Sequence, residues 1–208
     1  MGGGSVPGPE TGQQNRQVPG VAPTGGGDVQ GPVAASDGVE QDLRITGWPR
    51  TIEWVEFRHV AARPAGERED AQINPVTEGG EARTVRERGQ WKLAELELKI
   101  IVNLDDSWVV QSKKSDALKA HEQGHFDIHG LIAGRDMLEA LKALRERSSN
   151  RLGRAVGRTM ERHRQRAQQM SDAYDDDTEH GLNAARQAAW ATRIQNAIDN
   201  NSSLRAPD

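Results

Sequence analysis

The sequence predicts an α+β fold in which a small antiparallel sheet is followed by three helices. One observation behind this prediction is the alternation of apolar and polar residues over 96–104, which is typical of a strand with one buried face. Another is the spacing of apolar residues by three and four over 116–147, 151–173 and 182–199, which is typical of amphipathic helices. Because the strand and helix patterns occupy separate blocks, they favour α+β over an alternating α/β fold.

The 208 residues allow one core domain and a tail. Residues 1–40 are rich in Gly, Pro and Gln, and their scattered apolar residues cannot bury enough surface to offset the entropy lost on ordering. We therefore expect a disordered leader or linker over 1–40 and a folded domain over 41–208.

Short extended segments are expected on both sides of the strand at 96–104. Residues 43–60 are rich in apolar side chains, but Gly47 and Pro49 divide them into short pieces. Another short strand is expected near 72–76, within a polar stretch. Residues 103–107 predict a turn, and 108–111 predict a short partner strand.

The predicted helix boundaries follow from residue type. Ser115 is a good N-cap for the first helix, with Asp116 in its first turn. The polar residues 148–150 separate the first helix from the second. The polar residues 174–181 predict a loop between the second and third helices.

Composition and charge exclude several classes of protein. No apolar run approaches the ~20 residues that a membrane span needs, so no span is expected. The net charge of −4 argues against a general nucleic-acid binder, and no nucleic-acid partner is expected. The chain has no cysteine, so any metal must be held by His, Asp or Glu. The oligomeric state is left open.

The most informative motif is His121-Glu122-Gln123-Gly124-His125, an H-E-x-x-H pattern on a predicted helix. Residues four apart lie on one face, so two imidazoles can meet one zinc ion at the usual bond length of ~2.0–2.1 Å. Glu122 lies about 100° around the helix from His121, where a carboxylate can take a proton from zinc-bound water. The alternative is a solvated helix that carries two histidines by chance.

A catalytic zinc ion needs a third protein ligand, and two histidines are candidates. His129 follows His125 by four residues, but it stands about 12 Å from His121 along a straight helix. It would fit only if the helix broke at Gly130, and it is expected at the cleft edge or on the surface. His180 is favoured, because it stands in the predicted loop beside Gly181, and a loop can aim a ligand.

Other residues allow two interpretations each. Tyr174, the only tyrosine, either donates a hydrogen bond to an oxyanion or packs between helices. Asp175 and Asp177 either orient a ligand histidine or belong to a solvated acidic run. The strand at 96–104 either adds a substrate strand or is sheet core. Eight arginines between 145 and 166 form either a surface for an acidic partner or a solvated helix face.

The strings HEQGHFDI and YDDDTEHG, with Gln187 and Trp190 downstream, resemble a bacterial family of predicted secreted zinc-dependent proteases, numbered 922 among domains of unknown function. The resemblance covers about 41–200 and is strong over 117–190. It implies a zincin-like fold, with His121, His125 and His180 as Zn²⁺ ligands and Glu122 as the catalytic residue. It also implies a secreted or periplasmic protein, although no signal peptide is visible before the Gly/Pro-rich leader.

The leading hypothesis is therefore a zinc metallopeptidase that hydrolyses a peptide or protein substrate with a water activated by Glu122. One alternative is a non-catalytic zincin-like module that binds metal or serves as an adaptor. Another is an effector or toxin peptidase delivered by a specialised secretion machine, which the flexible leader would suit.

Overall fold

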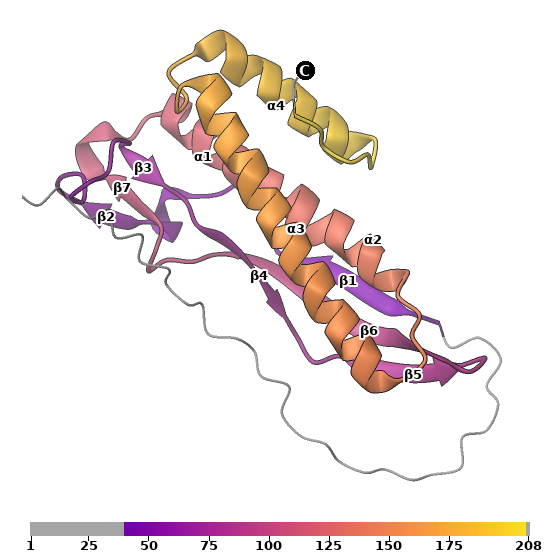
Figure 1. The fold of residues 1–208 in the computed structure, drawn as a ribbon. Coiled ribbons are helices and arrows are strands. Elements are labelled where there is room, and N and C mark those ends of the chain that lie inside the picture. Colours follow the sequence, from indigo (N-terminus) through magenta and orange to yellow (C-terminus); the bar gives the residue numbers. More distant parts are fainter. Residues whose placement is uncertain (1–39, 207–208) are drawn as a thin grey trace, which may run out of the picture. The chain divides into compact units, whose positions relative to one another are not determined.

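The computed structural model describes residues 40–206, shown as coloured ribbon in Figure 1. The leader predicted over 1–40 lies outside this range except for residue 40. The same holds for the role in export that was suggested for the leader. The described chain is α+β, with its strands before its long helices, as predicted. No helix in this range is both long and apolar enough to cross a membrane.

The larger sheet is built around β6 (Gln90–Val102), a strand of thirteen residues. β1 (Asp42–Thr46) pairs with β6 in parallel, whereas β4 (Pro75–Gly79) and β5 (Arg83–Glu87) pair with it antiparallel. Leu96, Leu98 and Ile100 are buried, which confirms the predicted alternation in this part of the strand. The predicted bounds of 96–104 are wrong at both ends, because β6 begins six residues before Leu96 and ends at Val102, and Leu104 is exposed.

A second sheet has β7 (Trp108–Val110) at its centre, between β2 (Arg58–Val60) in parallel and β3 (Ala71–Gln72) antiparallel. The prediction of a single antiparallel sheet is thus wrong, because the structure has two sheets and each contains both parallel and antiparallel pairs. The segment 108–111 also pairs with β2 and β3 and not with the strand before it. Alternation in a sequence shows which face of a strand is buried, but it carries no information about the direction of the neighbouring strand.

The first predicted helix begins as expected and contains a change of pitch. Ser115 caps α1 (Asp116–His129) by accepting a hydrogen bond from the Leu118 amide at 3.1 Å. A π-helical stretch over Gly130–Asp136 follows and leads directly into α2 (Met137–Lys142). Gly130 is required there, because a Cβ atom at this position would lie 2.4 Å from the ring of Trp48. Two short 3-10 turns, Trp54–Glu56 and Gln111–Lys113, complete the first half.

The second helix, α3, spans Ser149–Thr178, and the third, α4, spans Ala184–Asp199. The loop predicted over 174–181 is therefore wrong over its first five residues, which are the last turns of α3. The acidic run hides the helical stripe, but Met170, Tyr174 and Thr178 are spaced by four and are buried. Burial of this stripe outweighs the weak helix propensity of the aspartates between its members.

The helices pack so that α1 lies against both α3 and α4, while α2 lies against β1 and β6 (Figure 1). One core cluster joins α1 and the π-helical stretch to α3 and α4 through Ile128, Leu131, Met170 and Trp190. A second cluster joins α2 to the larger sheet through Leu43, Leu98 and Leu141. As a result, the motif-bearing face of α1 is placed beside the C-terminal end of α3.

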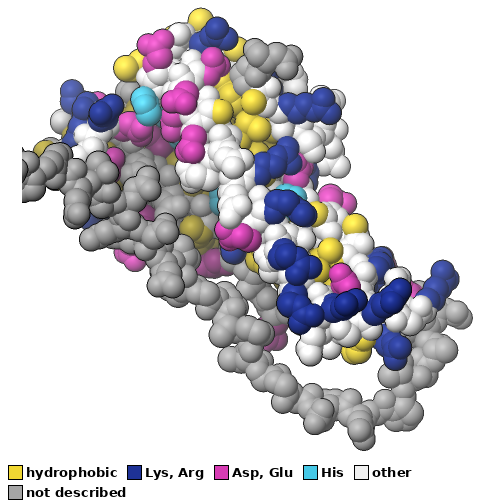
Figure 2. Space-filling view, in the orientation of Figure 1, with side chains coloured by type: hydrophobic (Ala, Val, Ile, Leu, Met, Phe, Trp, Pro, Cys, Tyr) yellow, Lys and Arg dark blue, Asp and Glu magenta, His cyan; other side chains and the backbone are white. Residues whose placement is uncertain are grey.

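The arginine-rich stretch forms an exposed band over the N-terminal half of α3, whereas acidic side chains gather near the opposite end of that helix (Figure 2). Arg151, Arg154 and Arg158 are exposed, and none has a carboxylate partner within residues 40–206. This agrees with a solvated helix face. Within this stretch His163 is buried, with its Nδ1 2.7 Å from the Thr159 carbonyl oxygen.

Candidate metal centre

The two motif histidines lie one turn apart on α1 and converge. Nε2 of His121 is 3.2 Å from Nε2 of His125, and the two rings meet edge to face. His121 is only 2% exposed. The residue between them in the turn, Gly124, leaves room for Tyr174, since a Cβ atom there would lie 2.3 Å from the Tyr174 hydroxyl oxygen. The glycine of the motif thus allows α3 to approach the metal-binding face.

A third donor comes from the last turns of α3. Oδ1 of Asp175 lies 3.1 Å from Nε2 of His121 and 2.9 Å from Nε2 of His125. Donors that share one zinc ion through ~2.0–2.1 Å bonds are separated by about 3.3 Å in a tetrahedral arrangement. The triangle formed by His121, His125 and Asp175 has nearly these dimensions, so it is a candidate site for a divalent cation.

The donors of this triangle shift one another's pKa. Burial alone would raise the pKa of the Asp175 carboxyl, but the neighbouring imidazoles of His121 and His125 hold it well below its usual range. Burial alone would lower the pKa of His121, but Asp175 and Glu122 raise it overall. Oδ1 of Asp175 is buried without a well-aligned hydrogen bond within residues 40–206, despite its short contacts to both imidazoles. This is the arrangement expected of atoms that face a common ion.

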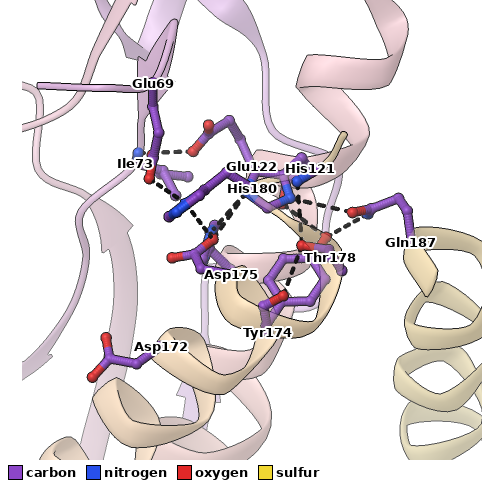
Figure 3. A network of polar contacts seen from close by, with 12 residues as sticks. Glu69, Ile73, His121, Glu122, Asp172, Tyr174, Asp175, Thr178, His180 and Gln187 are labelled. Atoms are coloured by element: carbon purple, nitrogen blue, oxygen red, sulfur yellow. Dashed lines mark hydrogen bonds and ion pairs between the residues drawn. The ribbon is translucent and has the colours of Figure 1, made fainter. Parts of the chain in front are cut away.

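Residues behind the donors fix their orientation (Figure 3). Oε1 of Gln187, on α4, lies 3.2 Å from Nδ1 of His121, and the Gln187 amide nitrogen donates to the Tyr174 hydroxyl. The Tyr174 ring stacks on the His121 ring with centroids 4.8 Å apart. A proton on Nδ1 of His121 that is shared with Gln187 leaves Nε2 unprotonated and free to bind a metal.

Glu122 stands beside the triangle in a buried position. It is 1% exposed, and its Oε2 accepts a hydrogen bond from the Ile73 amide at 2.9 Å. Its Oε1 has no hydrogen-bond partner in the described part of the chain. Burial raises the pKa of Glu122 to about 7, against a smaller opposing effect of the two histidines. A carboxylate with one oxygen anchored and one free is arranged to accept a proton.

His180 lies in the turn after α3, next to the triangle but in a second cluster with Glu69 and Asp175. Its Nδ1 is 2.6 Å from Oε1 of Glu69 and 3.8 Å from Oδ1 of Asp175. The structure therefore brings the predicted third ligand to the site, and it also brings Asp175 closer to the other two donors. The assignment of His180 as a ligand stays a prediction.

His129 is directed away from this site. Its ring contacts Thr77 of β4, with Nε2 2.9 Å from Oγ1, and burial lowers the pKa of His129 to about 4. His129 is half-buried against β4, so the expectation that it lies at the cleft edge or on the surface holds only in part. Its position results from the packing of β4 against α1, which the helical pattern does not reveal.

The Tyr174 hydroxyl is fully buried and donates to the backbone carbonyl of His121 at 3.3 Å, while it accepts from Gln187. These contacts favour the alternative in which Tyr174 packs between helices and supports His121. Its role at an oxyanion stays a prediction. Neither Glu69 nor Gln187 was identified as a site residue from the sequence. Gln187 was noted only because it follows the second motif in the resemblance, and no sequence pattern pointed to Glu69.

Comparison with known proteins gives one match. Residues 84–181, just under half of the chain, match the model of a family described as "Bacterial protein of unknown function (DUF922)". The matched segment contains the three donors of the triangle, Glu122 and His180, and it ends before Gln187. No curated protein and no solved structure matches the chain. The match thus joins the two motifs in one family, whose description names no activity.

Proposed function

We propose that this protein is a zinc-dependent metallopeptidase, in which His121, His125 and Asp175 hold the ion and Glu122 is the general base. The observation that carries the proposal is the triangle of donor atoms, with sides of 2.9 to 3.2 Å, beside a buried glutamate. Two neutral imidazoles and one carboxylate are a donor set found in catalytic zinc sites that leave one position open. In this proposal Asp175 replaces His180, the third ligand predicted from the sequence.

The ion supplies Lewis-acid chemistry, which makes water acidic and polarises a carbonyl group. The chain's own residues then handle the protons. Glu122 accepts a proton from the attacking water through Oε1 while its Oε2 stays held by the Ile73 amide. As the peptide C–N bond breaks, Glu122 delivers that proton to the leaving amine. The acyl carbon keeps the water oxygen, and Glu122 returns to its starting state.

Glu122 also argues for an enzyme over a pure binding module. A site that only stores a metal needs its ligands and the groups that orient them, and here Gln187 and Tyr174 already perform that second task. Burying a further carboxylate with one unpartnered oxygen costs folding free energy, since an unsatisfied buried polar group destabilises by roughly 1–3 kcal/mol. Such a cost is typical of groups whose partner is a reactant.

The test compares wild type with Glu122→Gln, which keeps the shape and the hydrogen bond from Ile73 but cannot accept a proton. We expect one zinc ion per chain in both proteins, and hydrolysis of casein or a mixed peptide library reduced roughly 10²–10⁴-fold in the variant. Glu161→Gln, on the exposed face of α3, is the matched control and should keep full activity.

Two results would overturn the proposal. Equal hydrolysis by wild type and Glu122→Gln would remove the assigned base. One zinc ion per chain without cleavage of any peptide in the library would support the non-catalytic binding module instead.

A further inference from the structure

Glu69 and His180 form a pair at the rim of the candidate metal centre. Glu69 lies in the segment before β3, and His180 lies between α3 and α4, so the pair joins two separate parts of the fold (Figure 3). Nδ1 of His180 lies 2.6 Å from Oε1 of Glu69, a hydrogen-bond distance. The His180 side chain is 47% exposed, in contrast to the buried His121, so the pair stands on the solvent side of the centre.

The backbone that aims His180 adopts an unfavourable conformation. Glu179, His180 and Gly181 have φ angles of 52°, 54° and 78°, all in the left-handed region. For the two residues with a side chain this conformation is unfavourable, because Cβ then lies close to the following carbonyl oxygen. The His180 amide donates to the Asp175 carbonyl at 2.9 Å, and the Gly181 amide donates to Thr178 Oγ1 at 3.2 Å. Strain that is held in place by such bonds is typical of functional segments.

The same turn lies directly against a ligand of the proposed ion. A Cβ atom on Gly181 would lie 3.0 to 3.1 Å from atoms of the His121 side chain. The turn that carries His180 is thus packed against His121, and Nδ1 of His180 lies 3.8 Å from Oδ1 of Asp175. Glu69 holds Nδ1 of the ring, whereas Nε2 has no partner within residues 40–206. A half-exposed histidine whose Nδ1 is held by Glu69, beside the proposed ligand Asp175, is placed to contact a bound substrate.

Two distances favour a substrate-contacting role for His180 over a role as a metal ligand. Donors that share a zinc ion lie about 3.3 Å apart, whereas His180 Nδ1 is 2.6 Å from Glu69 and 3.8 Å from Asp175. The first distance is that of a hydrogen bond and the second exceeds every side of the His121–His125–Asp175 triangle. The other use of this cluster, a second cation bound by Glu69, Asp175 and His180, is an outcome that metal counting distinguishes.

We propose that His180 is a further catalytic residue, which donates a hydrogen bond from Nε2 to the carbonyl oxygen of the scissile peptide bond, and that Glu69 is its positioning residue. The inference rests on the proposed peptidase function. When water adds to the carbonyl carbon, the carbonyl oxygen gains negative charge. A donor aimed at that oxygen therefore stabilises the transition state more than the substrate. The Glu69 carboxylate, 2.6 Å from Nδ1 of His180, fixes the orientation of the ring.

The test uses the zinc-loaded full chain and four variants: His180→Ala, His180→Gln, Glu69→Gln and the control Glu67→Gln, an exposed glutamate two residues before Glu69. Zinc affinity and stoichiometry are measured first. We expect one zinc ion per chain in every protein, with dissociation constants within about threefold of wild type, because His180 is not a ligand. Glu67→Gln should match wild type in every measurement.

The second measurement is catalysis of a cleaved peptide. His180→Ala should lower kcat roughly 100-fold with little change in KM, because the lost bond forms in the transition state. His180→Gln, which keeps an N–H donor, should recover part of that loss. Glu69→Gln should lower kcat about tenfold, because the ring loses its orienting charge but keeps its donor.

The third measurement does not need turnover. N-phosphoryl-leucyl-alanine carries anionic tetrahedral oxygens that mimic the transition state, and its affinity for zinc-loaded His180→Ala should fall roughly 100-fold.

Loss of zinc in His180→Ala would make His180 a ligand and overturn the inference. Two zinc ions in wild type, reduced to one in Glu69→Gln, would show a second cation and also overturn it. Unchanged kcat and unchanged inhibitor affinity would do the same. Zinc-loaded wild type that neither cleaves peptides nor binds the inhibitor would instead refute the proposed function itself.

Discussion

Oε1 of Gln187 lies 3.2 Å from Nδ1 of His121, and through this contact α4 orients a candidate metal ligand on α1. The Gln187 amide nitrogen also donates to the hydroxyl of Tyr174, whose ring stacks on His121. One side chain therefore sets both the protonation and the tilt of His121, and its loss should be measurable as a loss of metal affinity.

Replacing Gln187 with Leu should weaken zinc binding about 10–100-fold, the usual effect of removing a residue that orients a metal ligand. Without the amide oxygen, a proton on Nε2 of His121 competes with the metal. Gln195→Leu, on an exposed position of the same helix, is the control and should bind zinc as wild type does. Equal zinc affinity in the Gln187 and Gln195 variants, measured by competition with a chelating dye, would show that the contact is irrelevant to binding.

Replacing Gly124 with Ala should destabilise the protein and disturb the centre. The added Cβ atom would lie 2.3 Å from the Tyr174 hydroxyl oxygen and 2.6 Å from the adjoining ring carbon. Overpacking of this kind costs roughly 1–3 kcal/mol of unfolding free energy. Gly153→Ala is the matched control on α3, because a Cβ atom there would meet nothing within 4 Å. It should stabilise the helix by roughly 0.5–1 kcal/mol. Urea unfolding of both variants measures the difference, and equal effects would contradict the packing argument.

Removing the metal should lower thermal stability, because an ion that binds only the folded chain stabilises it by mass action. Zinc at a free concentration one hundred times its dissociation constant adds about 2.7 kcal/mol, which raises Tm by roughly 5–10 °C for a domain of this size. Asp175→Ala should show no zinc-dependent rise, whereas Asp176→Ala, its exposed neighbour, should respond like wild type. A zinc-dependent rise that survives in Asp175→Ala would remove Asp175 from the ligand set.

His129 should make stability depend on pH between 6.5 and 4. Its folded pKa of about 4 lies below the value of 6.5 for an unperturbed histidine, because burial and the nearby charge of Arg164 disfavour the imidazolium. Above pH 6.5 the ring is neutral in both states. As pH falls, the unfolded chain binds a proton that the folded chain does not, so stability decreases until about pH 4.

The full loss is about 3 kcal/mol of unfolding free energy, at about 1.4 kcal/mol for each unit of pKa difference. His129→Gln can still donate to Thr77 and cannot titrate, so it should lack this part of the pH dependence. Urea unfolding of both proteins in the presence of a chelator, at pH 7 and pH 4.5, isolates the difference. The same decrease in the variant would assign the effect to other groups.

Much of the site was predictable because its signals are local. Two histidines four residues apart, with a glutamate next to the first, lie on adjacent parts of a helix surface whatever the rest of the fold is. The Ser115 cap and the apolar spacing of 116–142 establish that helix without reference to its partners. The alternation of Leu96, Leu98 and Ile100 likewise identifies a buried strand face.

The third donor could not be chosen in the same way. The sequence string that contains Asp175 and His180 offers both residues within one short segment, and its acidic composition predicted a loop. Burial of Tyr174 and Thr178 extends α3 through this string, and that extension turns Asp175 toward the two imidazoles while His180 reaches the strained turn beyond. Sequence spacing cannot distinguish these positions, because the choice depends on packing against α1 and α4.

By itself, then, the sequence determined the helix and the relative placement of three side chains on it: two histidines spaced to meet one metal ion and the glutamate beside them, all set by interactions within one or two turns. Only the tertiary structure decided which distant groups complete and surround that pair. Asp175, Gln187 and Glu69 come from three separate segments, and they meet at His121 and His180 because the apolar faces of α1, α3 and α4 are buried together, a contact that no local pattern contains.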